Sequence, residues 1–280
     1  MKDLVTRTLT GIFIVVLFLG GIFLHPITFF LVQIVVMTGS LYEYYNIVES
    51  ETVKPDRVTG LLSGVAMYGI SSSVAAGSAS PAWYLLLVLP VIGVMVTELY
   101  KNRIKPFDSI AHTFGGLIYI ALPWSLVPFM SFNSDSISTL LGHSIDGFSP
   151  GAMIGLVILL WANDTGAYLV GITFGRHRLF ERISPKKSWE GFFGGFIAAL
   201  GVAFPVAVWI GITSLGGWII IAILVSVGGT FGDLIESMLK RSAGVKDSGS
   251  IMPGHGGFLD RFDSVLVAWP LMFLFLTFFG

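Results

Sequence analysis

Long apolar runs recur along most of this 280-residue chain, and they restrict its fold more than any other feature. A helix needs about 20 mostly apolar residues to cross a bilayer. Only 12% of the residues are charged, whereas a soluble domain averages about 25%. Nine runs approach the required length, at residues 8–24, 27–48, 58–76, 82–100, 108–132, 151–174, 189–213, 216–239 and 259–279. The sequence therefore predicts an all-α, polytopic integral membrane protein with nine transmembrane helices.

The basic residues predict how these helices are oriented. In the nine-helix arrangement, all 16 Lys and Arg residues fall on one side of the membrane, either in loops or before the first span. Cytoplasmic loops carry the excess of Lys and Arg. We therefore expect a multi-pass protein of the cytoplasmic (inner) membrane, with a cytoplasmic N-terminus and an external C-terminus.

Composition excludes several classes of function. The chain has no cysteine, so it has neither a disulfide framework nor a thiol nucleophile nor a Cys-ligated metal site. Its net charge of −1 provides no overall positive field, and we expect no nucleic-acid partner. The chemistry must therefore depend on local clusters of charge.

One such cluster occupies residues 237–264, between two apolar runs. Its five glycines let the backbone approach a ligand closely, and its cations and backbone N–H groups suit phosphate. Asp260 and Asp263 are three residues apart, so on a helix beginning near Leu259 both carboxylates face the same way. Since Mg²⁺ prefers one or two carboxylates plus substrate phosphates, the stretch predicts a magnesium-dependent phosphoryl site.

Acids inside the predicted spans extend this site. Asp164 lies within span six and Asp233 within span eight, and ionisable residues at membrane depth are usually functional. Together with Asp260 and Asp263 they could hold one or two cations, although an ion pair between helices would also explain them. Glu43 and Glu98 are interpreted as interfacial ends of their spans, with a scaffold role; the alternative is that they line a lipid entrance.

A basic loop precedes span seven. Pro185 is expected to set a turn and Ser188 to cap a helix beginning at Trp189, so that Lys186, Lys187 and the helix N-terminus form one anion site. The small residues Gly191, Gly194 and Gly195 predict close helix packing on one face of span seven. The other basic residues of this loop, Arg176, Arg178 and Arg182, are interpreted as topogenic.

The spacing of these motifs resembles the phosphatidate cytidylyltransferase family. The resemblance rests on Ser237-x-x-Lys240-Arg241, Lys246-Asp247, Pro253-Gly254-His255-Gly256-Gly257 and Asp260-Arg261-Phe262-Asp263, together with residues 163–168 and 184–191. It implies transfer of a cytidylyl group from CTP to phosphatidate, yielding CDP-diacylglycerol and pyrophosphate, with Mg²⁺ and room for a second cation.

Motif and resemblance together assign roles to residues. The predicted catalytic residues are Asp233, Asp260, Asp263, Lys240 and His255. The predicted phosphate-binding residues are Lys186, Lys187, Ser237, Arg241, Lys246 and Arg261. The predicted metal ligands are Asp164, Asp233, Asp260 and Asp263.

The expected organisation is a scaffold of about four helices at residues 1–106, which could also form a homodimer surface, and a catalytic region of about five helices at residues 107–280. One alternative is a cytidylyltransferase for another lipid phosphate. Another is an ion-coupled transporter, which would use the intramembrane acids as a cation path but would need no phosphate-binding cluster.

Overall fold

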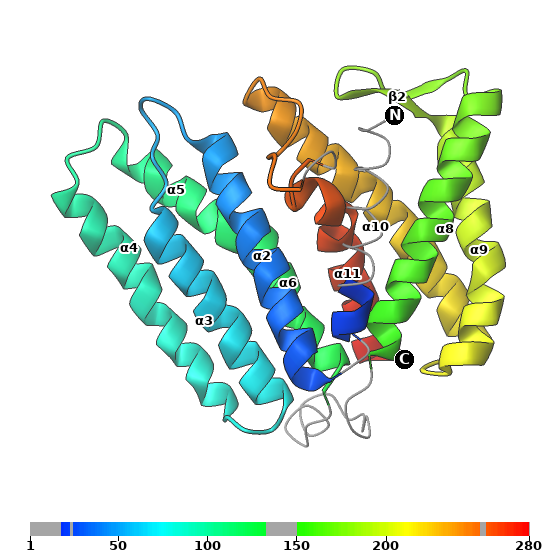
Figure 1. The fold of residues 1–280 in the computed structure, drawn as a ribbon, viewed down its shortest axis with the longest axis horizontal. Helices are drawn as coiled ribbons and strands as arrows, with labels where there is room; N and C mark the ends of the chain where they lie inside the picture. Colours follow the sequence, from blue (N-terminus) through cyan, green and yellow to red (C-terminus); the bar gives the residue numbers. More distant parts are fainter. Residues whose placement is uncertain (1–17, 23–24, 133–149, 253–255, 280) are drawn as a thin grey trace. The chain divides into compact units, whose positions relative to one another are not determined.

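The computed structural model describes residues 18–22, 25–132, 150–252 and 256–279. Within these ranges, eight helices are long and apolar enough to cross a membrane (Figure 1). They correspond to eight of the nine predicted spans, which confirms the all-α, polytopic membrane architecture. The first predicted span, residues 8–24, lies mostly outside the described residues, although residues 18–22 are helical.

The chain packs into two compact units. The first contains Met1–Phe148 and Ala243–Phe262, and the second contains Ser149–Ser242 and Asp263–Gly280. The predicted division at residue 106 concerns function and stays a prediction. Each unit is described separately below.

The described residues of the first unit include four complete spans. They are α2 (Pro26–Val48); α3 (Arg57–Ala75); the 3₁₀ helix η1 (Pro81–Leu87) with α4 (Val88–Tyr100); and a span of four segments, α5 (Pro106–Gly116), the π-helical η2 (Leu117–Ala121), α6 (Leu122–Leu126) and the 3₁₀ helix η3 (Val127–Met130). The fourth span changes helix type near Pro123 and Pro128, which lack the N–H group that a regular ladder needs. Pro26, Pro81 and Pro106 begin helices, as expected of residues placed at span boundaries.

An aromatic core joins α2, α3 and α5. Tyr45 and Tyr68 are fully buried, and the Tyr45 hydroxyl donates to the Thr113 carbonyl oxygen at 2.9 Å. A Cβ atom at Gly60 would lie 2.6 Å from Cζ of Tyr45, so only glycine lets α3 approach this ring. Packing in this unit therefore depends on large aromatic side chains set against small residues.

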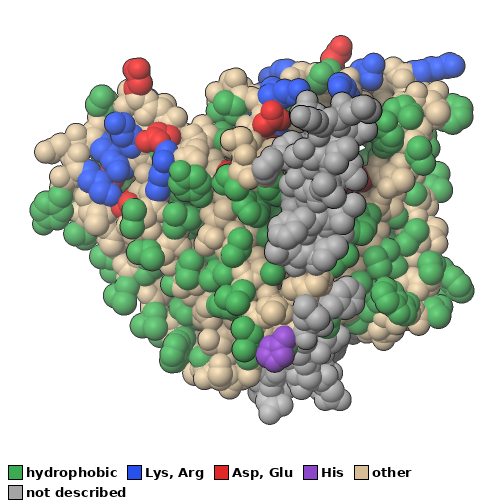
Figure 2. All heavy atoms as spheres, viewed as in Figure 1, with side chains coloured by type: hydrophobic (Ala, Val, Ile, Leu, Met, Phe, Trp, Pro, Cys, Tyr) green, Lys and Arg blue, Asp and Glu red, His purple; other side chains and the backbone are tan. Residues whose placement is uncertain are grey.

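Charged side chains of the first unit gather where the α2–α3 and α4–α5 loops lie (Figure 2). Arg57 pairs with Glu49, and Arg103 pairs with Glu98 at 3.1 Å. Glu98 is only 4% exposed, so Arg103 compensates a carboxylate that water barely reaches. This distribution agrees with both loops lying on one side of the membrane.

The second unit contains α8 (Gly151–Phe174), β1 (Arg178–Phe180), β2 (Ser184–Ser188), α9 (Trp189–Ile210), α10 (Leu215–Ser242) and most of α11 (Leu259–Phe279). Helices α8 and α9 lie side by side, and an antiparallel hairpin of β1 and β2 connects them (Figure 1). The sequence did not predict this hairpin. Pro185, expected to set a turn, lies instead inside β2. Among the described residues β2 pairs with β1 alone, and a missing N–H costs little on such an edge strand.

The predicted cap of α9 is confirmed. The Ser188 hydroxyl accepts a hydrogen bond from the Gly191 N–H at 3.1 Å, and Ser188 itself is extended and buried. The cap satisfies one of the N–H groups that a helix start leaves without a partner. It thereby fixes where the basic strand β2 ends and the membrane-spanning helix begins.

Asp56 organises the polar end of the first unit. It caps α3, accepting from the Thr59 N–H and hydroxyl, and it lies 2.6 Å from Nζ of Lys101 after α4. Burial raises the pKa of Asp56, but hydrogen bonds from Lys101 and Thr59 and the Lys101 charge outweigh this effect, and the net pKa lies below its usual value. The ionised form is thus stabilised in the folded protein.

We expect Asp56→Ala to destabilise the first unit by about 1 to 2 kcal/mol, the range for a lost N-cap. Because the folded-state pKa is depressed, this contribution is complete above the unfolded-state pKa and disappears as pH falls below about 4. The difference in Tm between wild type and variant should therefore shrink in acid. Asp108→Ala is the control, since the pair of Asp108 with Lys105 spans 3.6 Å and is half exposed. A pH-independent difference would contradict the assignment.

Candidate active site

A cavity of about 330 Å³ lies within the second unit. Its polar lining comes from α8, β2, α10 and α11 and includes four residues that were predicted for the site. They are Asp164, Lys186, Lys187 and Asp233. These positions are up to 69 residues apart along the chain, and the packing of the unit brings them around one space. The cavity therefore combines two carboxylates with two ammonium groups.

Lys187 and Asp233 form the central ion pair of this cavity. Nζ of Lys187 lies 3.0 Å from Oδ2 of Asp233, and the Ser237 hydroxyl, one turn further along α10, donates to Oδ1 at 3.2 Å. Both charged side chains remain partly exposed, so they can exchange partners when a ligand enters. Asp164 is exposed at the surface of α8 and accepts a long hydrogen bond of 3.4 Å from the Asn163 amide.

Asp263, on α11, lies beside this group. Its carboxylate is buried and accepts from the Ser264 N–H at 2.7 Å, and the charges of Asp233, Lys187 and Lys240 act on it. Gly232 allows α10 and α11 to touch, because a Cβ atom there would lie 2.5 Å from the Asp263 carbonyl oxygen. The second unit thus contains three of the predicted metal ligands, of which Asp164 and Asp233 line the cavity.

Lys240 and Arg241 occupy the last turn of α10, where positive charges interact favourably with the C-terminal end of the helix dipole. Lys240 pairs with Glu236, whose side chain is 1% exposed. Arg241 is exposed. Lys240 therefore neutralises a buried acid in addition to its predicted part in the site.

The remaining signature residues belong to the first unit. Lys246 and Arg261 are exposed, and His255 lies outside the described residues. Oδ2 of Asp260 accepts from the Ser248 N–H, the Ser248 hydroxyl and the Gly257 N–H, each at 2.9 Å. Gly256 has φ of 81°, and a Cβ atom there would lie 2.6 Å from Oδ2 of Asp260. Only glycine lets the loop turn so tightly around this carboxylate.

Comparison with known proteins identifies the family of this chain. Residues 5–279 match the model of the cytidylyltransferase family. The chain belongs to the cytidylyltransferase family. It is 33% identical over 270 residues to the phosphatidate cytidylyltransferase of Staphylococcus haemolyticus, and 34% identical over 275 residues to that of Staphylococcus epidermidis. Each alignment covers 95% of this chain and 96% of the relative. The protein is therefore a nucleotidyltransferase.

The cavity of this cytidylyltransferase has a donor set that fits Mg²⁺. Asp164, Asp233 and the amide oxygen of Asn163 are hard oxygen donors, and Oδ1 of Asn163 is buried without a hydrogen-bond partner. Among the described residues, no group of three or more His, Asp or Glu side chains is close enough to bind a metal without other ligands. Mg²⁺ keeps waters and takes further oxygens from substrate phosphates. The predicted ligand set, including Asp260 and Asp263, stays a prediction.

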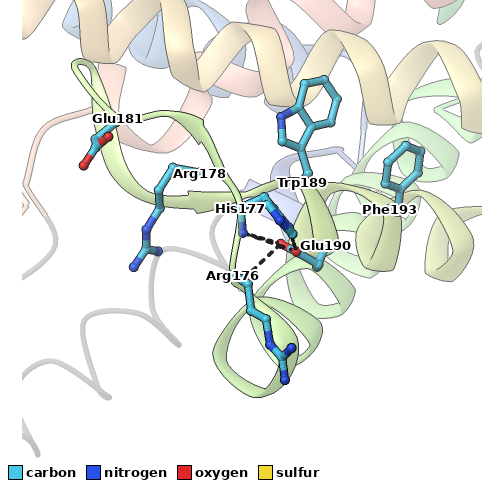
Figure 3. A pocket seen from close by; sticks show the side chains of 7 residues that line it. All are labelled: Arg176, His177, Arg178, Glu181, Trp189, Glu190 and Phe193. Carbon is cyan, nitrogen blue, oxygen red and sulfur yellow. Dashed lines mark hydrogen bonds and ion pairs between the residues drawn. The ribbon is translucent and has the colours of Figure 1, made fainter.

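A second hollow of about 780 Å³ lies between the hairpin, with the residues just before it, and the first turns of α9 (Figure 3). Glu190 accepts from the N–H groups of Arg176 and His177, and Nδ1 of His177 lies 2.6 Å from its Oε1. The guanidinium groups of Arg176 and Arg178 point away from Glu190. None of the predicted site residues lines this hollow. Glu190 thus fastens the end of α8 to the start of α9 in this cytidylyltransferase.

Sequence reasoning missed one residue. Glu43 of α2, interpreted as scaffold, accepts hydrogen bonds from Ser248, Phe258 and Leu259 of the signature stretch. The signal that could have revealed it is the one applied to Asp164, namely an acid within an apolar span. The identity of its partners, about 200 residues away, was not readable from the local sequence.

Close packing of α8 and α9 shapes the cavity wall. A Cβ atom at Gly195 would lie 2.5 Å from the Asn163 carbonyl oxygen, and one at Gly191 would lie 2.9 Å from the Ala167 carbonyl oxygen. The predicted small face of span seven is therefore confirmed. It holds Asn163 and Asp164 against α9.

We expect Gly195→Ala to lower the thermal stability of this cytidylyltransferase, because the added methyl group meets the backbone of α8, which cannot move aside without separating the helices. Gly201→Ala on the same helix is the matched control, since nothing lies within 4 Å of its Cβ position. Thermal unfolding in detergent should give a Tm several degrees lower for Gly195→Ala only, consistent with about 1 to 3 kcal/mol for overpacking. Equal melting of both variants would refute the close contact.

Proposed function

We propose that this protein catalyses the reaction of CTP with phosphatidate to give CDP-diacylglycerol and pyrophosphate. The observation that carries the proposal is the cavity in which Lys186 and Lys187 meet Asp164 and Asp233. Such a cavity pairs cations for phosphate with carboxylates for a metal ion. Relatives named phosphatidate cytidylyltransferase, with 33–34% identity over 95% of the chain, support the choice of substrates.

In the proposed reaction, an oxygen of the phosphatidate monoester attacks the α-phosphorus of CTP. A new P–O bond forms to that oxygen, and the bond between the α-phosphorus and the bridging oxygen breaks, releasing pyrophosphate. The phosphate monoester is already anionic near neutral pH, so the attack requires little help from a general base. The main task of the protein is to align the two phosphates and to stabilise their charge.

The lysines of β2 suit this task. Lys186 is exposed and Lys187 is partly exposed beside the capped N-terminus of α9, so both can bind phosphate oxygens at a helix end that favours anions. The Lys187–Asp233 pair keeps both groups oriented in the absence of substrate. When a phosphate enters, Lys187 can donate to it while the Ser237 hydroxyl continues to bond Asp233.

Asp164 and Asp233 would hold Mg²⁺, with Asp260 and Asp263 as the further predicted ligands, and the bound ion would neutralise charge on the triphosphate. The acids must therefore be accessible to the ion in the folded protein. Asp164 and Asp233 both line the cavity, and the side chain of Asp233 is partly exposed. The acyl chains of phosphatidate would remain in the bilayer.

The decisive experiment incubates purified protein with labelled CTP, phosphatidate and Mg²⁺. We expect a CDP-lipid and pyrophosphate. Lys187→Ala should reduce kcat/KM by about tenfold or more, because it removes a charge-assisted contact to phosphate and releases Asp233. Arg178→Ala is the control, since Arg178 lines the other hollow, and it should stay within about twofold.

Equal losses in both variants would contradict the assignment of Lys187 to the site. If a CDP-lipid forms only when phosphatidate is replaced by another lipid phosphate, the substrate assignment fails while the reaction type stands. Absence of any CDP-lipid would refute the proposal.

We further propose that the phosphates react at the cytoplasmic face of the inner membrane. The loop between α2 and α3 carries Lys54, whereas the turn between α3 and η1, residues 76–80, carries no charge. In this cysteine-free chain, Glu51→Cys and Ser78→Cys place single thiols at exposed positions on opposite ends of α3. We expect an impermeant maleimide to label Glu51→Cys only from the cytoplasmic side and Ser78→Cys only from the other. Labelling of both from one side would refute the orientation.

A further inference from the structure

Glu43 is a buried acid within an apolar helix. It lies in α2, and its side chain is 1% exposed. An ionised carboxylate in such surroundings is costly unless donors compensate it, and acids at membrane depth usually serve function. The donors that bond the Glu43 carboxylate therefore indicate its role.

Three donors compensate Glu43, and all belong to the signature stretch. Oε1 accepts from the Phe258 N–H at 3.0 Å, and Oε2 accepts from the Leu259 N–H and the Ser248 hydroxyl, each at 2.9 Å. Leu259 is the first residue of α11, so its N–H lacks a partner within the helix. A carboxylate from α2 thus caps α11, the helix that carries Asp260, and its negative charge interacts favourably with the N-terminal end of the helix dipole.

Two glycines of the loop allow this contact. A Cβ atom at Gly249 would lie 2.6 Å from Oε1 of Glu43, and one at Gly257 would overlap the Glu43 carboxylate and the Ser248 hydroxyl. One turn earlier on α2, Gly39 leaves room for the Phe258 ring, which would lie 2.5 Å from a Cβ atom there. Gly39 and Glu43 share one face of α2, so this face is shaped to receive the loop.

Ser248 connects Glu43 to Asp260. Its hydroxyl oxygen lies 2.9 Å from Oε2 of Glu43 and 2.9 Å from Oδ2 of Asp260, and its N–H also donates to Asp260 at 2.9 Å. The hydroxyl therefore lies between the two carboxylates, and because it has a single proton it donates to one of them at a time. Ser248 thus links Glu43 to Asp260 through this shared proton, while its N–H holds Asp260 separately.

We propose that Glu43 is a positioning residue, which holds residues 248–260 on α2 and orients Asp260 through Ser248. This assigns a part of the nucleotidyl-transfer machinery to α2, a helix that the sequence analysis interpreted as scaffold. Its effect on turnover rests on the proposed function, whereas its effect on the loop does not. The test therefore measures both.

The loop is tested by single thiols in the cysteine-free chain. Ile251→Cys reports on the loop, because Ile251 is 50% exposed, and Ser78→Cys reports on the same unit away from the loop. In purified, detergent-solubilised protein without substrates, we expect Glu43→Gln to raise the maleimide labelling rate of Ile251→Cys by about fivefold, because a neutral amide keeps the volume but weakens charge-assisted acceptance of three hydrogen bonds. Labelling of Ser78→Cys should not change.

Glu98→Gln is the matched control. Glu98 is an equally buried acid of the same unit, but it pairs with Arg103 and makes no contact with the loop among the interactions of the described residues. It should lower Tm without changing the labelling of Ile251→Cys. If Glu98→Gln raises this labelling as much as Glu43→Gln, or if Ser78→Cys labelling rises with it, Glu43 is only structural and the proposal fails.

Ser248→Ala keeps the proposal testable if Glu43→Gln does not fold. It removes the bridge to Asp260 but leaves the bonds from Phe258 and Leu259 to Glu43, so we expect a folded protein with normal Tm. In the assay with CTP, phosphatidate and Mg²⁺, both Ser248→Ala and Glu43→Gln should lower kcat by about tenfold or more with KM for CTP changed little, as expected for misplacement of a group without loss of binding.

Two outcomes would overturn the proposal. One is unchanged kcat in Ser248→Ala, and the other is unchanged Ile251→Cys labelling in Glu43→Gln. If wild type makes no CDP-lipid, the proposed function fails, and the labelling experiment still decides whether Glu43 holds the loop.

Discussion

Burying a carboxylate inside a membrane protein is costly unless cations or hydrogen-bond donors compensate it, and the structure depends on how each acid is compensated. In the first unit, Arg103 compensates Glu98, and three donors of the signature stretch compensate Glu43. In the second, Lys187 compensates Asp233 and Lys240 compensates Glu236. The partners of Glu98, Glu43 and Asp233 lie in connecting segments, so these pairings hold a segment against a helix, whereas Lys240 and Glu236 lie one turn apart on α10.

The acids differ in how far their carboxylates remain accessible to water and ligands. Glu43 and Glu98 are almost inaccessible to water, and Glu43 meets its donors mainly through the backbone of the signature stretch. Asp233 and Lys187 remain partly exposed at a cavity, and Asp164 is exposed. A buried acid with fixed partners can orient its neighbours, whereas an accessible acid can also bind a ligand. This difference separates positioning residues from the residues proposed to hold the substrates and Mg²⁺.

Sequence patterns anticipated the local features that depend on neighbouring residues. The cap at Ser188 and the small face of α9 follow from residues within one or two turns, and the structure confirms both. Eight spans follow from hydropathy alone. Pro185 shows the limit of such rules, because a turn-forming residue also fits an edge strand, and the pairing of β2 with β1 decided between them. The sequence analysis placed Lys187 in an anion site and Asp233 among the metal ligands, but it did not predict that the two form an ion pair of 3.0 Å.

The sequence by itself determined that this chain is an all-α membrane protein of the cytidylyltransferase family, because hydropathy and motif spacing are properties of consecutive residues. Only the tertiary structure decided which partner each acid takes. Glu43 and Glu98 look alike in sequence, each beside aromatic or apolar neighbours near a span end. One bonds a loop about 200 residues away and the other an arginine five residues away. The reason is physical: a hydrogen bond depends on distance in space, and helix packing sets that distance.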